Sequence, residues 1–177
     1  MKQVLLNKLR AFRREDAGNI ATEFVVMVPI LLLALMAGVE IGIMTIRQTM
    51  LERSLDETVR WIRLNTGASP THEELKAMVC QYGVVPDCQE NLTLELLPRN
   101  LRAWEALPED YACIDKSTEI TPMSEYSFGM DNELVIIRAC AKFEPIFPGT
   151  SFAAALTQDD AGYASITKMT AFVQEPR

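Results

Sequence analysis

A single carboxylate, Glu23, stands near the start of the longest apolar run of this chain. Phe24 to Val39 carries no charge, and no lysine or arginine occurs between Arg14 and Arg47. A run of this kind predicts a membrane helix. A carboxylate inside such a helix costs on the order of 2.5 to 3.5 kcal/mol even on the milder insertion scales. We therefore expect a compensating positive charge close to Glu23.

Groups that could carry catalysis or hold a metal are sparse. His72 is the only histidine, and no G-x-S-x-G, H-E-x-x-H or glycine-rich phosphate loop occurs. We expect His72 to be a solvent-facing helix residue rather than a base. The adjacent acidic pairs lack the spaced oxygen ligands and the glycine of a calcium loop; they are Glu73-Glu74, Glu109-Asp110 and Asp159-Asp160. The sequence thus predicts no enzyme activity, no cofactor and no metal site.

Four cysteines follow the apolar run: Cys80, Cys88, Cys113 and Cys140. They contain no C-x-x-C spacing, which argues against a zinc or thioredoxin-like redox site. On the exported side of a membrane an even number of cysteines indicates disulfides. Three pairings are possible. We favour Cys80 with Cys88 and Cys113 with Cys140, and buried free thiols are the alternative.

Charge is distributed unevenly along the chain. Residues 1–18 carry five basic and two acidic residues, whereas residues 47–177 carry 12 basic and 20 acidic ones. The positive-inside bias predicts a cytoplasmic N-terminus and an exported C-terminal part. The acidic C-terminal part also argues against nucleic acid as a partner, because nucleic acid requires a basic surface.

A cleaved secretory signal and an uncleaved signal anchor are two other interpretations of the N-terminus. A secretory signal has an apolar region of about 7 to 15 residues that ends at a small-x-small cleavage site. Here the apolar run is longer and ends at Glu40 without such a site, and Ala34, Ala37 and Gly38 do not fit the spacing. We therefore favour an anchor that is processed at its cytoplasmic side.

The apolar run is expected to continue as one helix from about Asn19 to Asn65. Apolar residues recur at spacings of four, four and three at Leu51, Leu55, Val59 and Ile62, which is typical of an amphipathic helix. Pro29 is expected to kink this helix. Gly38 and Gly42 form a small-xxx-small face that suits another helix, or are simply tolerated in a membrane helix.

A small α+β domain is predicted after Gly67-Ala68-Ser69-Pro70. Thr71 and Glu74 form a capping box, so a short helix is expected from Thr71 to about Tyr82, with Leu75, Met78 and Val79 facing inward. Strands are expected at Asn91–Leu97, Glu133–Phe143 and Tyr163–Val173, and loops from Pro98 to Asn132 with one helical turn around Leu101 to Ala106. The strands are expected to form a small antiparallel sheet against the lower half of the long helix.

The sequence Gly18-Asn19-Ile20-Ala21-Thr22-Glu23-Phe24 resembles the processing site of a type IV prepilin, in which glutamate is the fifth mature residue. Pro29-Ile30-Leu31-Leu32-Leu33 and Val39-Glu40-Ile41-Gly42 are similar to TadE-like minor pseudopilins of the tight-adherence (Flp) pilus system. The resemblance is strong over about residues 12–65 and weaker in the C-terminal stretch from Val135–Cys140 to Phe172–Pro176. Residues 66–130 contain no motif for comparison.

The resemblance implies a pilin-like protein of the bacterial inner membrane, with a single span, that is packed into or at the tip of a pilus. It implies a leader at 1–18, a transmembrane helix at 19–46, an amphipathic continuation at 47–65 and a periplasmic domain at 66–177. A prepilin peptidase would cut between Gly18 and Asn19, and Glu23, Phe24 and Glu40 would serve assembly. The expected partners are the major Flp pilin, other minor pseudopilins and the inner-membrane assembly platform. The alternative is a single-pass, membrane-anchored periplasmic sensor or binding protein.

Overall fold

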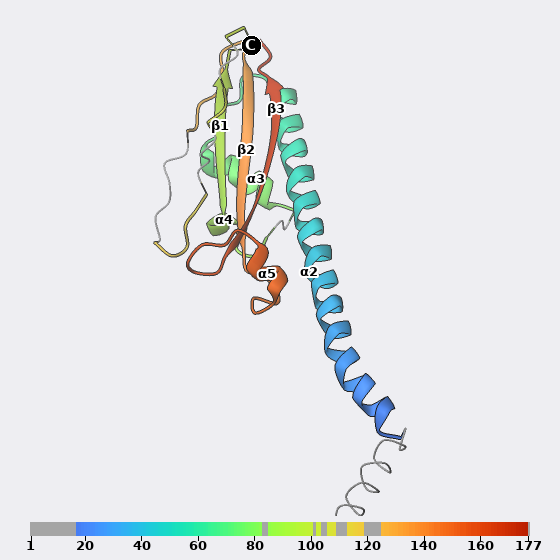
Figure 1. Cartoon of the computed structure of the whole chain (residues 1–177). Coiled ribbons are helices and arrows are strands. Elements are labelled where there is room, and N and C mark those ends of the chain that lie inside the picture. The colour runs from blue at the N-terminus through green and yellow to red at the C-terminus, as the bar shows by residue number, and fades with distance from the viewer. Residues whose placement is uncertain are drawn as a thin grey trace, which may run out of the picture. The chain divides into compact units, whose positions relative to one another are not determined.

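The computed structural model describes residues 17–82, 85–100, 102–103, 106–108, 113–118 and 125–176. The predicted leader therefore lies outside the described residues, except for Ala17 and Gly18. The chain divides into two compact units, residues 1–39 and 40–177. Both units share the helix α2, Ala17–Leu64, which has 48 residues and continues through Pro29. The second unit adds a short helix, two single helical turns and a sheet (Figure 1).

The sheet is antiparallel and has the strand order β1-β2-β3. Its strands are β1 at Leu92–Arg99, β2 at Leu134–Phe143 and β3 at Ala164–Val173. The three strands predicted from the sequence are confirmed, with ends that shift by one or two residues. Pro98, predicted to begin a loop, lies within β1. A proline is tolerated there because β1 is an edge strand that pairs along its length only with β2.

A short helix, α3, spans His72–Cys80 and begins at the predicted capping box. The Thr71 hydroxyl accepts the Glu74 N–H, and the Glu74 carboxylate accepts the Thr71 N–H at 2.8 Å. Leu75 and Val79 are fully buried, whereas Met78, predicted to face inward, is only half-buried. The turns α4 (Cys88–Asn91) and α5 (Ser151–Ala155) were not predicted. A helical turn was expected around Leu101 to Ala106. Within this range the structure describes residues 102 and 103, which form a turn, and Ala106; the others lie outside the described residues.

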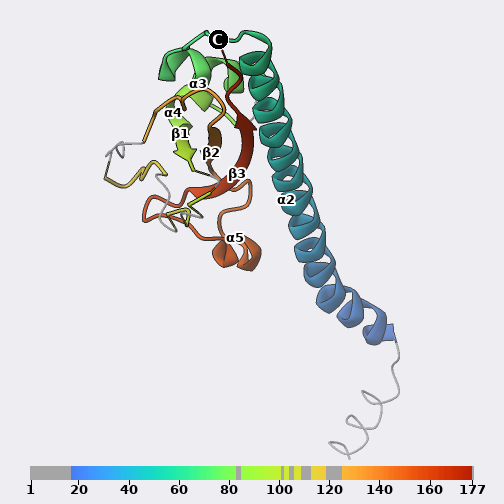
Figure 2. The same cartoon turned by 90° about the horizontal axis from the view of Figure 1, so that it is seen from above.

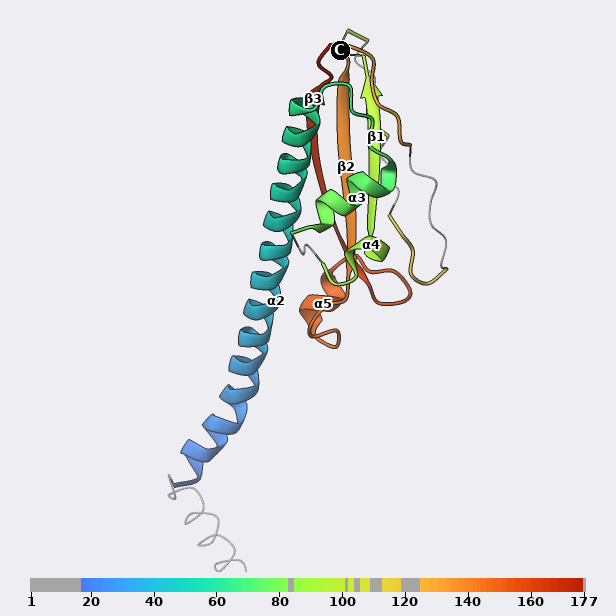
Figure 3. The same ribbon diagram turned by 180° about the vertical axis from the view of Figure 1, so that it is seen from behind.

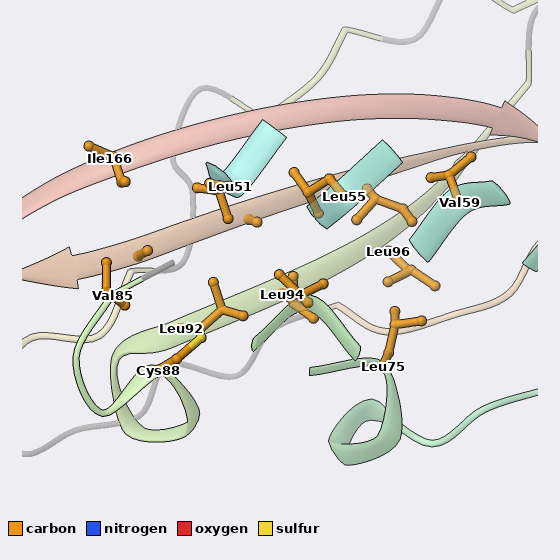
Figure 4. Close-up of a cluster of buried hydrophobic side chains, with 14 of the residues drawn as sticks. Leu51, Leu55, Val59, Leu75, Val85, Cys88, Leu92, Leu94, Leu96 and Ile166 are labelled. Carbon is orange, nitrogen blue, oxygen red and sulfur yellow. The ribbon is translucent and has the colours of Figure 1, made fainter. Parts of the chain in front are cut away.

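The core of the second unit lies between one face of the sheet and two helices. The C-terminal half of α2 contributes Leu51, Leu55, Val59 and Ile62, the residues of the amphipathic spacing (Figure 4). These side chains meet the leucines of β1 and the apolar residues of β2 and β3 that share this face: Leu92, Leu94, Leu96, Val135, Ile137, Ala139, Ala141, Ile166 and Phe172. Residues 47–65 therefore share one core with the sheet, in agreement with the expectation that the sheet lies against this half of the long helix.

The helices α3 and α4 cover the same face of the sheet. The helix α3 contacts β1 and α4 contacts β2, on the side seen in Figure 3. The helix α2 runs along β3, where Lys168 pairs with Glu52 at 3.3 Å and Arg63 pairs with Glu175 at 3.8 Å. The turn α5 lies beyond the end of β2 and the start of β3 (Figure 2). The far end of β2, near Leu134, is thus remote from α5.

Two disulfides reinforce this unit. The structure joins Cys80 at the end of α3 to Cys88 at the start of α4, and Cys113 of the loop after β1 to Cys140 of β2. Each pair has a Cα–Cα distance of 5.6 Å, which lies in the usual range for a disulfide. These are the two pairings that the sequence analysis favoured.

Candidate functional site

The side chains with potential chemistry are dispersed in the structure. Within the described residues, no three His, Cys, Asp or Glu side chains come together as a metal site. His72 is half-buried rather than solvent-facing, and its Nε2 lies 3.2 Å from the Leu94 carbonyl oxygen. Its ring also stands edge-on to Tyr126 at a centroid distance of 5.2 Å. His72 therefore ties α3 to β1.

The first half of α2 presents apolar side chains on all sides. Phe24 is 68% exposed, and exposed leucines, isoleucines and valines follow along the helix: Ile20, Val25, Val26, Ile30, Leu31, Leu32, Leu33, Leu35 and Val39. A helix that is apolar all round requires an apolar environment. Its length and composition are compatible with a single-pass membrane anchor.

Glu23 is exposed on this apolar surface, one position before Phe24. The backbone of the predicted cleavage site is helical, with α2 beginning at Ala17. The glycine Gly38 has nothing within 4 Å of the position where a Cβ would lie. The same holds for Gly42. Each glycine thus leaves the α2 backbone open to close approach by another helix.

Glu40 has a different setting from Glu23, because it is 2% exposed. Its carboxylate accepts the N–H of Ile146 at 3.0 Å and the N–H of Phe147 at 3.0 Å. A carboxylate that accepts successive backbone N–H groups is strongly held, since such charge-assisted bonds are about twice as strong as neutral ones. Glu40 therefore fastens the loop after β2 to α2, across 106 residues of sequence.

Arg47 lies two helical turns after Glu40 on the same side of α2. Its guanidinium carbon is 4.7 Å from the centroid of the Phe143 ring, which is a cation–π geometry. Arg47 also interacts electrostatically with Glu40. Glu40, which the sequence analysis placed within the span at 19–46, thus binds the loop that follows β2, and Arg47, just after the predicted span, packs on the last residue of β2.

The outer face of the sheet carries two buried ion pairs. Arg138 of β2 pairs with Glu95 of β1 at 3.2 Å, and Lys142 pairs with Asp159 at 3.0 Å. Burial raises the pKa of Asp159, but hydrogen bonds from the Tyr163 N–H, the Lys142 ammonium and the Lys116 N–H outweigh it, so that the pKa lies below its ordinary value. The sequence analysis missed these pairs, and considered Asp159 only as half of an acidic pair that does not fit a calcium loop.

An open groove of about 600 Å³ lies between α2 and α3. Its apolar lining comes from Trp61, Leu64, Met78 and Tyr82. At the rim of the groove, hydrogen bonds from Tyr82 and from Arg53 lower the pKa of Glu57. The same bond to Glu57 raises the pKa of Tyr82. Trp61 and Leu64 are exposed, so the groove offers an apolar surface on the second unit.

Comparison with known proteins identifies the N-terminal part of the chain. The family model of TadE-like proteins matches residues 18–60. The TadE-like segment runs from Gly18 of the predicted cleavage site through the exposed apolar helix to Arg60 of the core-forming half of α2. The match confirms the resemblance and suggests a role in tight-adherence (Flp) pilus systems. No curated protein and no solved structure matches the chain.

Proposed function

We propose that this protein is a minor pseudopilin that takes part in assembly of a tight-adherence (Flp) pilus. The match of residues 18–60 supports this proposal most directly, because it covers Gly18, Glu23 and the apolar helix together. The chain would be inserted in the bacterial inner membrane with its N-terminus in the cytoplasm and residues 40–177 in the periplasm. Its role would be structural rather than catalytic.

The proposed mechanism uses the helix as the polymerising element. A prepilin peptidase would cut between Gly18 and Asn19 and leave a new amino group one turn from Glu23. The exposed apolar face of α2 would pack against the helices of the major Flp pilin and other minor pseudopilins at the inner-membrane assembly platform. Glu23 would then pair with the amino group of a neighbouring chain, since oppositely charged groups attract more strongly in low-dielectric surroundings.

Cleavage of the leader tests this proposal. We expect the mature chain to begin at Asn19 in cells with an active prepilin peptidase, and at Met1 in otherwise identical cells that lack the peptidase. The substitution Gly18→Val should block the cut, because it adds bulk where the peptidase approaches the backbone. Intact-mass analysis of the membrane-extracted protein distinguishes the two products. A chain that begins at Met1 in peptidase-positive cells contradicts the proposal.

A membrane-anchored sensor or binding protein is the second candidate function. The groove between α2 and α3 favours it, because Trp61, Leu64, Met78 and Tyr82 offer apolar surface to a ligand. A plain anchor has no reason to lose its leader after Gly18. Retention of the leader together with ligand binding in this groove would therefore favour the sensor over the pseudopilin.

A further inference from the structure

The segment of residues 145–156, which includes α5, is mostly apolar, and its polar side chains are Thr150 and Ser151. Its sequence PIFPGTSFAAAL has no charged residue. Ile146 is 42% exposed, Pro148 and Ala154 are exposed, and Phe147 and Phe152 are half-buried. Folding of the chain therefore leaves much of the apolar surface of this segment uncovered, in a loop where polar residues are usual.

The backbone of this segment is largely satisfied within the protein. The N–H groups of Ile146 and Phe147 donate to Glu40, and Thr150 caps α5 through the Ala153 N–H at 3.2 Å. Further N–H groups are bonded within the segment, namely those of residues 150, 154 and 156. Because unpaired backbone groups are what usually exclude a loop from apolar surroundings, these bonds lower the cost of bringing the loop to a lipid interface.

Glu40 fixes the level along α2 at which the segment lies. Its carboxylate holds Ile146 and Phe147 at 3.0 Å, and its backbone directly follows Val39, the last residue of the exposed apolar helix. Ile20 to Val39 spans about 30 Å at 1.5 Å per residue. That length equals the hydrocarbon thickness of a typical bilayer, about 30 Å. If these residues fill the hydrocarbon, Glu40 and the segment that it binds lie at the membrane surface.

We propose that residues 145–156 insert into the lipid interface next to the membrane span, as a second contact of this protein with the bilayer. The lack of charge suits the interface between headgroups and acyl chains. Arg47 lies about 10 Å beyond Glu40 by helix rise, so its charge would stay outside the hydrocarbon. This proposal rests on one part of the proposed function, the membrane anchor. It does not require leader cleavage or pilus assembly.

Tryptophan fluorescence of the full chain in vesicles tests the proposal. The protein is reconstituted in phosphatidylcholine–phosphatidylglycerol vesicles whose acyl chains carry bromine near the headgroups. Trp61→Phe and Trp104→Phe remove the native signals. A single tryptophan is then placed by Ile146→Trp, which keeps the N–H that Glu40 accepts. The matched control is Met130→Trp, because Met130 is 79% exposed and precedes the opposite end of β2. Leu31→Trp reports on the anchor itself.

We expect brominated lipid to quench Ile146→Trp several-fold more than Met130→Trp, and aqueous iodide to quench them in the reverse order. Equal quenching of the two by lipid overturns the proposal. Protection of Ile146→Trp from both quenchers also overturns it, because protein rather than lipid would then cover the segment. Phe152→Trp repeats the measurement should Ile146→Trp fail to fold. Quenching of Leu31→Trp by deeply brominated lipid shows separately that the anchor is inserted.

Discussion

Glu23 and Glu40 show how two glutamates on one helix can differ at the scale of single residues. Glu23 is exposed on an apolar surface, whereas Glu40 is buried and accepts two backbone N–H groups of its own chain. The carboxylate of Glu23 is therefore available to a neighbouring molecule and that of Glu40 is not. The two residues predicted together as assembly residues thus have separate environments.

The first residue-scale prediction concerns pilus assembly. Glu23→Leu should leave insertion and leader cleavage normal and abolish assembly, because it removes the charge that would pair with a neighbour. Glu40→Gln should be milder, since the amide oxygen still accepts an N–H from the loop. Surface piliation and crosslinking to the major pilin measure both variants. Wild-type assembly of Glu23→Leu would contradict the mechanism.

A second residue-scale prediction concerns pH and the pair of Asp159 with Lys142. The folded-state pKa of Asp159 is below its ordinary value, so this carboxylate stabilises the fold above the ordinary aspartate pKa. The stabilisation is lost as the pH falls through the lower, folded-state pKa. Asp159→Asn leaves Lys142 buried without its partner, which should cost about 3 kcal/mol at neutral pH. Urea unfolding from pH 7 downward should show a smaller acid dependence in Asp159→Asn; an unchanged dependence would contradict this assignment.

At the scale of elements, the disulfides connect α3 to α4 and the loop after β1 to β2. Cys113–Cys140 closes a loop with a sequence separation of 27 and Cys80–Cys88 one with a separation of 8. Loop-closure entropy predicts that removing the first costs about 3.6 kcal/mol and removing the second about 2.5 kcal/mol. Denaturant unfolding of the Cys113→Ala/Cys140→Ala and Cys80→Ala/Cys88→Ala variants measures the difference. Titration of the denatured, unreduced wild type should find no free thiol, and the finding of four would refute the pairing.

At the scale of the whole molecule, the compact second unit extends from Glu40 to the C-terminus. Its core uses Leu51, Leu55, Val59 and Ile62, which precede the domain boundary predicted at residue 66. We expect residues 40–177 to fold in water without the apolar first unit. Residues 66–177 should not fold, because loss of a buried leucine or isoleucine side chain costs about 2 to 5 kcal/mol, and three of these and Val59 are missing, against a total stability of about 5 to 15 kcal/mol.

Circular dichroism and urea unfolding of the two fragments, purified with their disulfides formed, test this prediction. The fragment 40–177 should unfold in one cooperative transition. A cooperative transition of similar midpoint in the fragment 66–177 would show that α2 is dispensable for the core. The substitution Leu55→Ala in the longer fragment provides an intermediate case, with a loss of about 2 to 5 kcal/mol.

The sequence by itself determined the features that depend on neighbouring residues. The apolar run, the spacing of Leu51, Leu55, Val59 and Ile62, the capping box at Thr71 and the alternation of the strands are local patterns, and each predicted its element. Only the tertiary structure showed that Glu40 binds Ile146 and Phe147 and that Asp159 pairs with Lys142. The physical reason is that these contacts join residues 17 to 107 positions apart, and no local periodicity records which distant N–H group or ammonium a carboxylate meets.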